Sequence, residues 1–211
     1  MDVTNPLRSL TPTVDADVLA VLVKTHAPLT GARVHQLAGR SYAQVRQVLH
    51  RLVNDGLVEA VRHGKAVSYT LNRDHVLAAA LEQAAGADAE TERRLRSAFA
   101  TWSPAPTAAV LFGSFARRDG GADSDVDLLL IRPDDVDEDD PAWTARRYEV
   151  SRSIARWTGN TAQIVELTDE ELAKAVRRRD KLIANLRRDG QVLIGPDLSS
   201  LLGRPVARRS R

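Results

Sequence analysis

The chain has 211 residues, 43% of them hydrophobic, and its 30 basic and 28 acidic residues give a formal net charge of only +2. This length suits two small domains, and the hydrophobic content is sufficient for two cores. The absence of cysteine, with Met1 as the only methionine, excludes disulfide bonds and sulfur-ligated metals. The first ten residues lack the apolar core of a signal peptide, and no apolar run reaches membrane-spanning length. We therefore expect a cytoplasmic protein without a membrane partner.

Three short helices are predicted in the first part of the chain. Apolar residues recur at helical spacing after Asp15, which we interpret as a helix cap, and Pro28 ends the run. Thr30 opens a second helix that ends at Gly39, and Ser41 starts a third. The third helix carries one apolar stripe, formed by Val45, Val48, Leu49, Leu52 and Val53.

A basic hairpin is predicted after these helices. The apolar segments 57–61 and 66–71 flank a tight tip at 62–65 that contains arginine, histidine, glycine and lysine. From Gly31 to Arg73 the chain has seven basic residues against two acidic ones, although its overall charge is nearly balanced. This local excess of positive charge favours binding to DNA.

Three helices followed by a basic-tipped hairpin resemble the winged helix-turn-helix of bacterial transcription regulators. The resemblance implies that the third helix lies in a major groove of double-stranded DNA and that the hairpin lies along the backbone. Gln44, Arg46 and Gln47 are the candidates for reading bases, since glutamine pairs with adenine edges and arginine with guanine edges. The other predicted DNA-binding residues, mostly phosphate contacts, are Arg40, Ser41, Tyr42, Arg51, Arg62, His63 and Lys65. A winged domain used for dimerisation is the alternative, and the resemblance also leads us to expect a homodimer.

Two further helical stretches, 74–85 and 88–102, are separated by a break at 86–87. We predict a DNA-binding domain with its connecting helix at 1–86, a second domain at 87–198, and a basic disordered tail at 199–211. Within the second domain, 143–157 is expected to form an amphipathic helix and 170–189 another.

Two apolar runs in the second domain are predicted to be buried strands. The run 109–112 ends at Gly113, and the run 126–131 is closed by Pro133. Asp125 and Asp127, two positions apart, share one face of a strand. Two carboxylates this close repel each other, and a cation between them allows both to stay ionised at neutral pH. Such oxygen ligands suit Mg²⁺, which takes further ligands from substrate phosphates.

The dipeptide Gly113-Ser114 supplies the complementary half of this site. Glycine allows the backbone to approach a phosphate, while the following N–H groups and the Ser114 hydroxyl donate hydrogen bonds to it. The sequence therefore predicts a site for a metal-bound nucleotide.

The segments 113–117 (GSFAR) and 124–128 (SDVDL) resemble the signature of the minimal nucleotidyltransferases, in the DNA polymerase β superfamily. The resemblance covers roughly residues 88–197 and includes 186–195 (LRRDGQVLIG), which is similar to the usual end of the family's domain. It implies an α+β protein of two domains, with a nucleotidyltransferase-like α/β domain built on a small mixed sheet after the winged helix.

The resemblance also implies the ligands and their residues. A nucleoside triphosphate would be the substrate, Mg²⁺ the cofactor, and a protein or RNA hydroxyl the acceptor. The catalytic residues would be Gly113, Ser114, Asp125 and Asp127, with both aspartates as metal ligands. Nucleotide binding would involve Gly113, Ser114, Arg117 and Ser124.

One position departs from the family pattern. Active relatives carry a third carboxylate on a later strand, and the matching strand here, 161–167, has Gln163 at that position. An amide cannot accept a proton near pH 7. Glu166, three residues on, faces the other side of a regular strand unless a bulge shifts the register.

Two functions therefore remain open. The chain is either a DNA-binding regulator whose second domain binds Mg-NTP and transfers a nucleoside monophosphate, or a transcription regulator whose degenerate second domain only senses nucleotide. A third possibility, the toxin half of a two-gene system, is disfavoured by the fused DNA-binding part.

Overall fold

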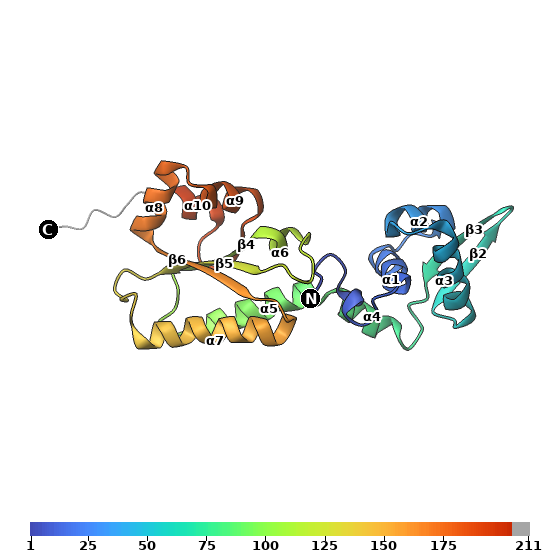
Figure 1. Cartoon of the computed structure of the whole chain (residues 1–211), viewed down its shortest axis with the longest axis horizontal. Coiled ribbons are helices and arrows are strands. Elements are labelled where there is room, and N and C mark those ends of the chain that lie inside the picture. The colour runs from blue at the N-terminus through green and yellow to red at the C-terminus, as the bar shows by residue number, and fades with distance from the viewer. Residues whose placement is uncertain (204–211) are drawn as a thin grey trace. The chain divides into compact units, whose positions relative to one another are not determined.

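The computed structural model describes residues 1–203 (Figure 1). The chain divides into two compact units. The first unit comprises Asp2 and Thr4–Ala87, and the second comprises Met1, Val3 and the chain from Asp88 onward. No helix in residues 1–203 is long and apolar enough to cross a membrane.

The first unit combines helices with a three-stranded antiparallel sheet of order β1-β3-β2. Its elements are η1 (Pro6–Ser9), α1 (Val14–Lys24), β1 (Leu29–Thr30), α2 (Gly31–Ala38), α3 (Tyr42–Asn54), β2 (Val58–His63), β3 (Ala66–Leu71) and α4 (Ala78–Ala85). The apolar stripe of α3 contributes to the core of this unit through Val45, Val48, Leu49 and Leu52, with Val53 packed at its edge.

The predicted caps of α2 and α3 are present. Thr30 and Ser41 are the N-caps, and their hydroxyls accept hydrogen bonds from backbone N–H groups at 3.3 Å each. Gly39 ends α2 in the left-handed conformation, with φ of 63°. The predicted cap of α1 was wrong. Thr13 is the extended residue that precedes α1, and the carboxylate of Asp15 lies within the first turn, where it accepts a hydrogen bond from the Thr13 hydroxyl.

The hairpin pairs β2 with β3 in register from Val58↔Leu71 to His63↔Ala66. Its turn contains Gly64, whose φ of 61° is in the left-handed region. Strand β1 pairs with β3 as a third strand that the sequence analysis did not predict. The fold of this unit is therefore the three-helix arrangement with a β-hairpin wing.

The second unit is built on a four-stranded sheet of order β6-β5-β4-β7. Its elements are α5 (Ala87–Ala100), β4 (Ala108–Phe112), α6 (Gly113–Arg117), β5 (Val126–Arg132), α7 (Pro141–Thr158), β6 (Ala162–Thr168), α8 (Asp169–Arg178), α9 (Lys181–Asp189), β7 (Gln191–Ile194) and α10 (Leu198–Gly203). Strands β5 and β6 are parallel, whereas β4 is antiparallel to both β5 and β7. The predicted small mixed sheet, and with it the α+β fold class, is confirmed.

Helices cover both faces of this sheet, with α5 and α7 on one side and α8, α9 and α10 on the other (Figure 1). Alternate residues of β4 and β5 contribute to the two cores. Ala109, Leu111, Leu128 and Leu130 pack toward α5 and α7, and Ala108, Val110, Leu129 and Ile131 pack toward the other helices. Burial on both faces explains why these strands are continuous apolar runs.

The single helix predicted at 170–189 was wrong, because this segment forms α8 and α9. Arg179 ends α8 with φ of 56°, and Asp180 is extended. The apolar pairs Leu172/Ala175 and Ile183/Leu186 are spaced by eleven residues, close to three helical turns. The spacing of the apolar residues is therefore the same for one continuous helix as for two separate helices, so it could not reveal the break.

The predicted start of a disordered tail at residue 199 was also wrong. Helix α10 extends to Gly203, and Leu201 and Leu202 are buried in the core beneath α8 and α9. The remaining residues of the predicted tail, 204–211, lie outside the described residues.

Candidate functional site

The backbone of Gly113 lies directly against the side chain of Asp127. Phe112 and Asp127 are paired across β4 and β5, and Gly113 follows with φ of 74° at the start of α6. A Cβ atom at residue 113 would lie 2.0 Å from Oδ2 of Asp127. Only glycine fits this position, because a side chain would overlap the carboxylate and would also be strained.

The two predicted metal ligands are close enough to influence each other. Burial raises the pKa of Asp127 above its usual 3.8, and the negative charges of Asp125 and Asp189 raise it further, against the opposite effect of Arg117. A cation would relieve this repulsion, so the two carboxylates fit a divalent ion. Residues 1–203 contain no cluster of three or more histidine, cysteine or acidic side chains arranged for a metal.

Two hydroxyl groups border Gly120, next to the start of α6. A Cβ atom at Gly120 would lie 3.0 Å from Oγ of Ser114 and 3.2 Å from Oγ of Ser124. The buried amide of Asn160 donates to the carbonyls of Ala122 (3.0 Å) and Ser124 (2.8 Å), which fixes the loop that carries Ser124. The fold thus brings together the two serines that the sequence analysis assigned to nucleotide binding.

Arg117 is held by Asp189, a residue that the sequence analysis did not assign to the site. One oxygen of Asp189 accepts a hydrogen bond from Arg117 at 2.5 Å, and the other accepts from the backbone N–H of Gly113 at 3.3 Å. The side chain of Asp189 is 3% exposed. Burial opposes its ionisation, but the hydrogen bonds from Arg117, Arg188 and Gly113 hold its pKa below the usual value. An anionic group of the chain therefore lies at the N-terminus of α6, where a phosphate was predicted to bind.

Gln163 lies beside Asp127 on the neighbouring strand. The two residues are paired in the parallel register of β5 and β6, so their side chains lie on the same face of the sheet. Glu166 instead forms ion pairs with Arg132 at 2.6 Å and Arg147 at 2.5 Å. The residue of β6 that is paired with Asp127 is thus an amide.

All residues predicted to contact DNA are exposed: Arg40, Ser41, Tyr42, Gln44, Arg46, Gln47, Arg51, Arg62, His63 and Lys65. Several already have partners within the chain. Ser41 donates to Gln44 at 2.8 Å as part of the cap of α3, and Arg40 pairs with Asp17 at 2.5 Å. Arg51 pairs with both Asp15 and Asp55.

The basic side chains of Arg46, Arg62 and Lys65 form no ion pair within residues 1–203, whereas His63 is hydrogen-bonded to Ser68 at 3.2 Å. Positive charge on the exposed side of α3 and on the wing is thus concentrated in these three residues.

Comparison with known families matches each unit separately. The family model described as the sugar-specific transcriptional regulator TrmB matches residues 12–72, and the model for the nucleotidyltransferase domain matches residues 92–205. The second match spans more than half of the chain, so the chain belongs to the nucleotidyltransferase-domain family. The predicted fusion of a regulator-type winged helix with such a domain is confirmed.

Among solved structures, the chain is similar to a toxin–antitoxin crystallised with AMP-PNP, with 19% identity over 53% of this chain and 78% of that chain and a TM-score of 0.37. It is also similar to the MarR family transcriptional regulator SPO1453 from Silicibacter pomeroyi DSS-3, with 24% identity over 44% of this chain and 67% of that chain and a TM-score of 0.34. The toxin–antitoxin MntA-HpeT mutant D39ED41E is 17% identical over 53% of this chain and 78% of that chain, with a TM-score of 0.36. No curated protein matches the chain.

Proposed function

We propose that the second unit binds a nucleoside triphosphate with Mg²⁺ and transfers its nucleoside monophosphate to an acceptor hydroxyl, while the first unit binds double-stranded DNA. The observation that supports the nucleotide site is the direct approach of the Gly113 backbone to Asp127, beside the hydroxyls of Ser114 and Ser124. Family membership supports the class of reaction.

Each residue of the site has a separate part in this proposal. Asp125 and Asp127 would hold the metal, which when bound supplies positive charge that offsets the charge of the triphosphate. Ser114 and Ser124 donate hydrogen bonds to phosphate oxygens, and Arg117 adds a guanidinium. The acceptor oxygen forms a bond to the α-phosphorus as the bond to the departing pyrophosphate breaks.

Removal of the proton from the acceptor hydroxyl is the step for which the site lacks a base. Gln163 beside Asp127 cannot accept a proton, and Glu166 is already paired with two arginines. The proton of the acceptor hydroxyl then passes to water, and since general base catalysis contributes on the order of 10²- to 10⁴-fold, transfer is expected to be slow. The same observation favours a second candidate function, in which the domain only senses nucleotide and alters the affinity for DNA.

Nucleotide binding is measured first, with the full chain, Mg²⁺ and a non-hydrolysable triphosphate analogue. Asp125→Asn and Asp127→Asn should each abolish the Mg²⁺-dependent part of binding. Unchanged Mg²⁺ dependence in both variants would remove the proposed metal site.

Transfer is measured separately, with each α-³²P-labelled nucleoside triphosphate and protein or RNA acceptors. Label in an acceptor that depends on Asp127 supports the transferase. Mg²⁺-dependent binding without label transfer, together with a nucleotide-dependent change in DNA affinity, supports the sensor.

The DNA proposal is supported by the match to the regulator family over 12–72 and by the unpaired positive charges of Arg46, Arg62 and Lys65. Fluorescence anisotropy with labelled duplexes at several salt concentrations tests it. Affinity should fall steeply as salt increases. A purified chain that shows no salt-dependent association with duplex DNA would contradict this part of the proposal.

A further inference from the structure

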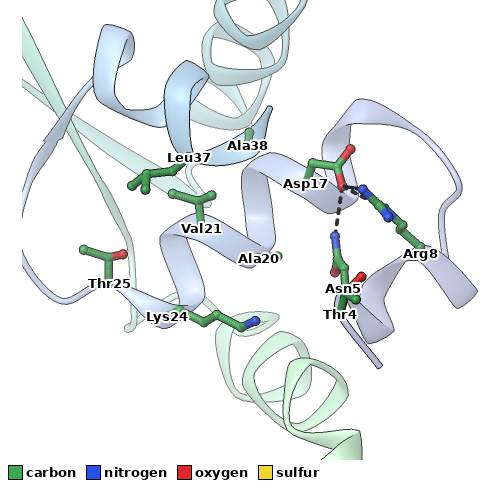
Figure 2. Close-up of a pocket in the computed structure, with 10 residues that line it drawn as sticks. All are labelled: Thr4, Asn5, Arg8, Asp17, Ala20, Val21, Lys24, Thr25, Leu37 and Ala38. Carbon is green, nitrogen blue, oxygen red and sulfur yellow. Dashed lines mark hydrogen bonds and ion pairs between the residues drawn. The ribbon is translucent and has the colours of Figure 1, made fainter. Parts of the chain in front are cut away.

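A cavity of about 320 Å³ lies within the first unit, between η1, α1 and α2 (Figure 2). Its volume is in the range of small-molecule binding sites, roughly 300–1,000 Å³. Its wall has an aliphatic side, formed by Ala20, Val21, Leu37 and Ala38. The polar side is formed by Asn5, Arg8, Asp17 and Lys24, with Thr4 and Thr25.

The charged groups of this wall are unequal in number. Asp17 is 4% exposed, and its carboxylate is bound by Arg8 at 2.7 Å and by Arg40 at 2.5 Å. Arg8 also pairs with Asp2. The negative charges of Asp2 and Asp17 therefore balance the positive charges of Arg8 and Arg40. The ammonium group of Lys24 has no ion-pair partner within residues 1–203, and one positive charge is left over.

The end of α1 does not cancel the charge of Lys24. This residue lies in the last turn of the helix, where the macrodipole amounts to about half a negative charge. A net positive field therefore remains at the cavity.

We propose that this cavity binds a small aliphatic carboxylate. The carboxylate lies near Lys24 and Arg8, and the hydrocarbon part lies against Val21, Leu37 and the two alanines. Both sides of the wall are aliphatic or polar and contain no aromatic ring, which favours branched or straight chains over flat ring systems.

Binding at this cavity has a consequence for Arg40 that rests on the proposed DNA-binding function. Asp17 divides its carboxylate between Arg8 in the wall and Arg40 at the start of α3. A bound carboxylate attracts Arg8, which leaves Arg40 as the stronger partner of Asp17. Arg40 is then less available to a DNA phosphate, so the ligand should lower the affinity for DNA.

The binding site is tested by isothermal titration calorimetry on the full chain with isovalerate and 4-methylvalerate. The uncharged probe is isovaleramide, which has nearly the same shape. We expect at least one acid to bind and the amide to bind at least ten times more weakly. Absence of binding by both acids, or equal binding of acid and amide, would overturn the proposal.

Two variants locate the site. Lys24→Gln should weaken binding of the acid at least tenfold, and Ala38→Met should reduce it by filling the cavity. Lys181→Gln makes the same change of charge in the second unit and should leave binding unchanged. Circular dichroism checks that each variant is folded. Wild-type affinity in both cavity variants would show that the acid binds elsewhere, which also overturns the proposal.

The effect on DNA is measured by anisotropy with and without isovalerate. Calorimetry uses no DNA, so failure of DNA binding leaves the test of the cavity intact. If the acid binds but the DNA affinity does not change, the linkage through Asp17 and Arg40 is contradicted, while the proposed binding site is not.

Discussion

The guanidinium of Arg117 lies 2.5 Å from a carboxylate oxygen of Asp189, and the other oxygen of Asp189 accepts the N–H of Gly113. Arginine and helix N-terminal N–H groups are the donors that a phosphate uses. Asp189 therefore occupies two donors of the proposed nucleotide site and adds negative charge beside Asp127.

Asp189→Asn should tighten the binding of a triphosphate analogue about fivefold to tenfold. The change weakens the hold on Arg117 and on the Gly113 N–H, and one hydrogen bond to a charged group is worth about 1.5–3 kcal/mol at most. Filter binding with Mg²⁺ present measures this. In the double variant with Arg117→Ala the gain should largely disappear, and weaker binding in Asp189→Asn alone would mean that Asp189 positions Arg117 for the ligand.

Asp127→Asn should raise the free energy of unfolding at pH 7 in the absence of metal. The pKa of Asp127 is raised in the folded state, so the folded protein holds this proton more tightly than the unfolded chain does. The ionised carboxylate of Asp127 therefore lowers the free energy of unfolding. This destabilisation is absent below the usual pKa of 3.8, develops as the pH rises from 3.8 to the raised pKa, and is complete above the raised pKa. Urea denaturation at pH 7 and pH 3 should show the gain only at pH 7.

The exposed loop residue Asp135 is the matched control, because Asp135→Asn removes the same charge away from the site. If Asp127→Asn raises the free energy of unfolding at both pH values, the cause is improved packing and not the removal of a charge.

Local spacing was sufficient to predict several parts of the structure. The alternation at Asp125 and Asp127 places both carboxylates together, and the residue types at Thr30 and Ser41 predict helix caps. Asp189 escaped prediction because it is separated from Gly113 by 76 residues and reaches it only through the packing of α9. A two-residue strand such as β1 has too few residues to show a period.

Charge pairing was equally invisible in the sequence. Arg40 and Arg51 were predicted as phosphate contacts, but the fold pairs Arg40 with Asp17, and Arg51 with Asp15 and Asp55. Which arginines stay unpaired depends on tertiary contacts, and these are not encoded in local spacing.

Arg46→Ala and Arg62→Ala should each weaken DNA binding several-fold, and Arg62→Ala, which removes a proposed phosphate contact, should also reduce the salt slope by about one. Arg51→Ala should have a smaller effect, since its charge is already offset by two acids. Anisotropy titrations of the three variants at several salt concentrations give both quantities. Equal losses in all three would indicate that the ion pairs of Arg51 open on binding DNA.

Gly113→Ala should abolish nucleotide binding and lower stability by about 1–3 kcal/mol. The new methyl group would meet the Asp127 carboxylate at 2.0 Å, and the φ of 74° is unfavourable for alanine. Gly121→Ala is the control, because a Cβ atom there has no neighbour within 4 Å. Thermal denaturation and binding of the triphosphate analogue should distinguish Gly113→Ala from Gly121→Ala. Wild-type nucleotide binding in Gly113→Ala would contradict the close approach of the Gly113 backbone to Asp127.

Gln163→Asp should raise nucleotide transfer if the proposed reaction is limited by the missing base. The new carboxylate would lie next to Asp127 in the β5–β6 register and could take the acceptor's proton, an effect on the order of 10²- to 10⁴-fold. Gln163→Asn, which changes the length of the side chain but not its charge, should leave the rate low. Single-turnover label transfer compares the three proteins at equal nucleotide occupancy. If Gln163→Asp binds nucleotide and Mg²⁺ yet transfers no faster than Gln163→Asn, the missing base is not what limits the site, and the sensor function is favoured.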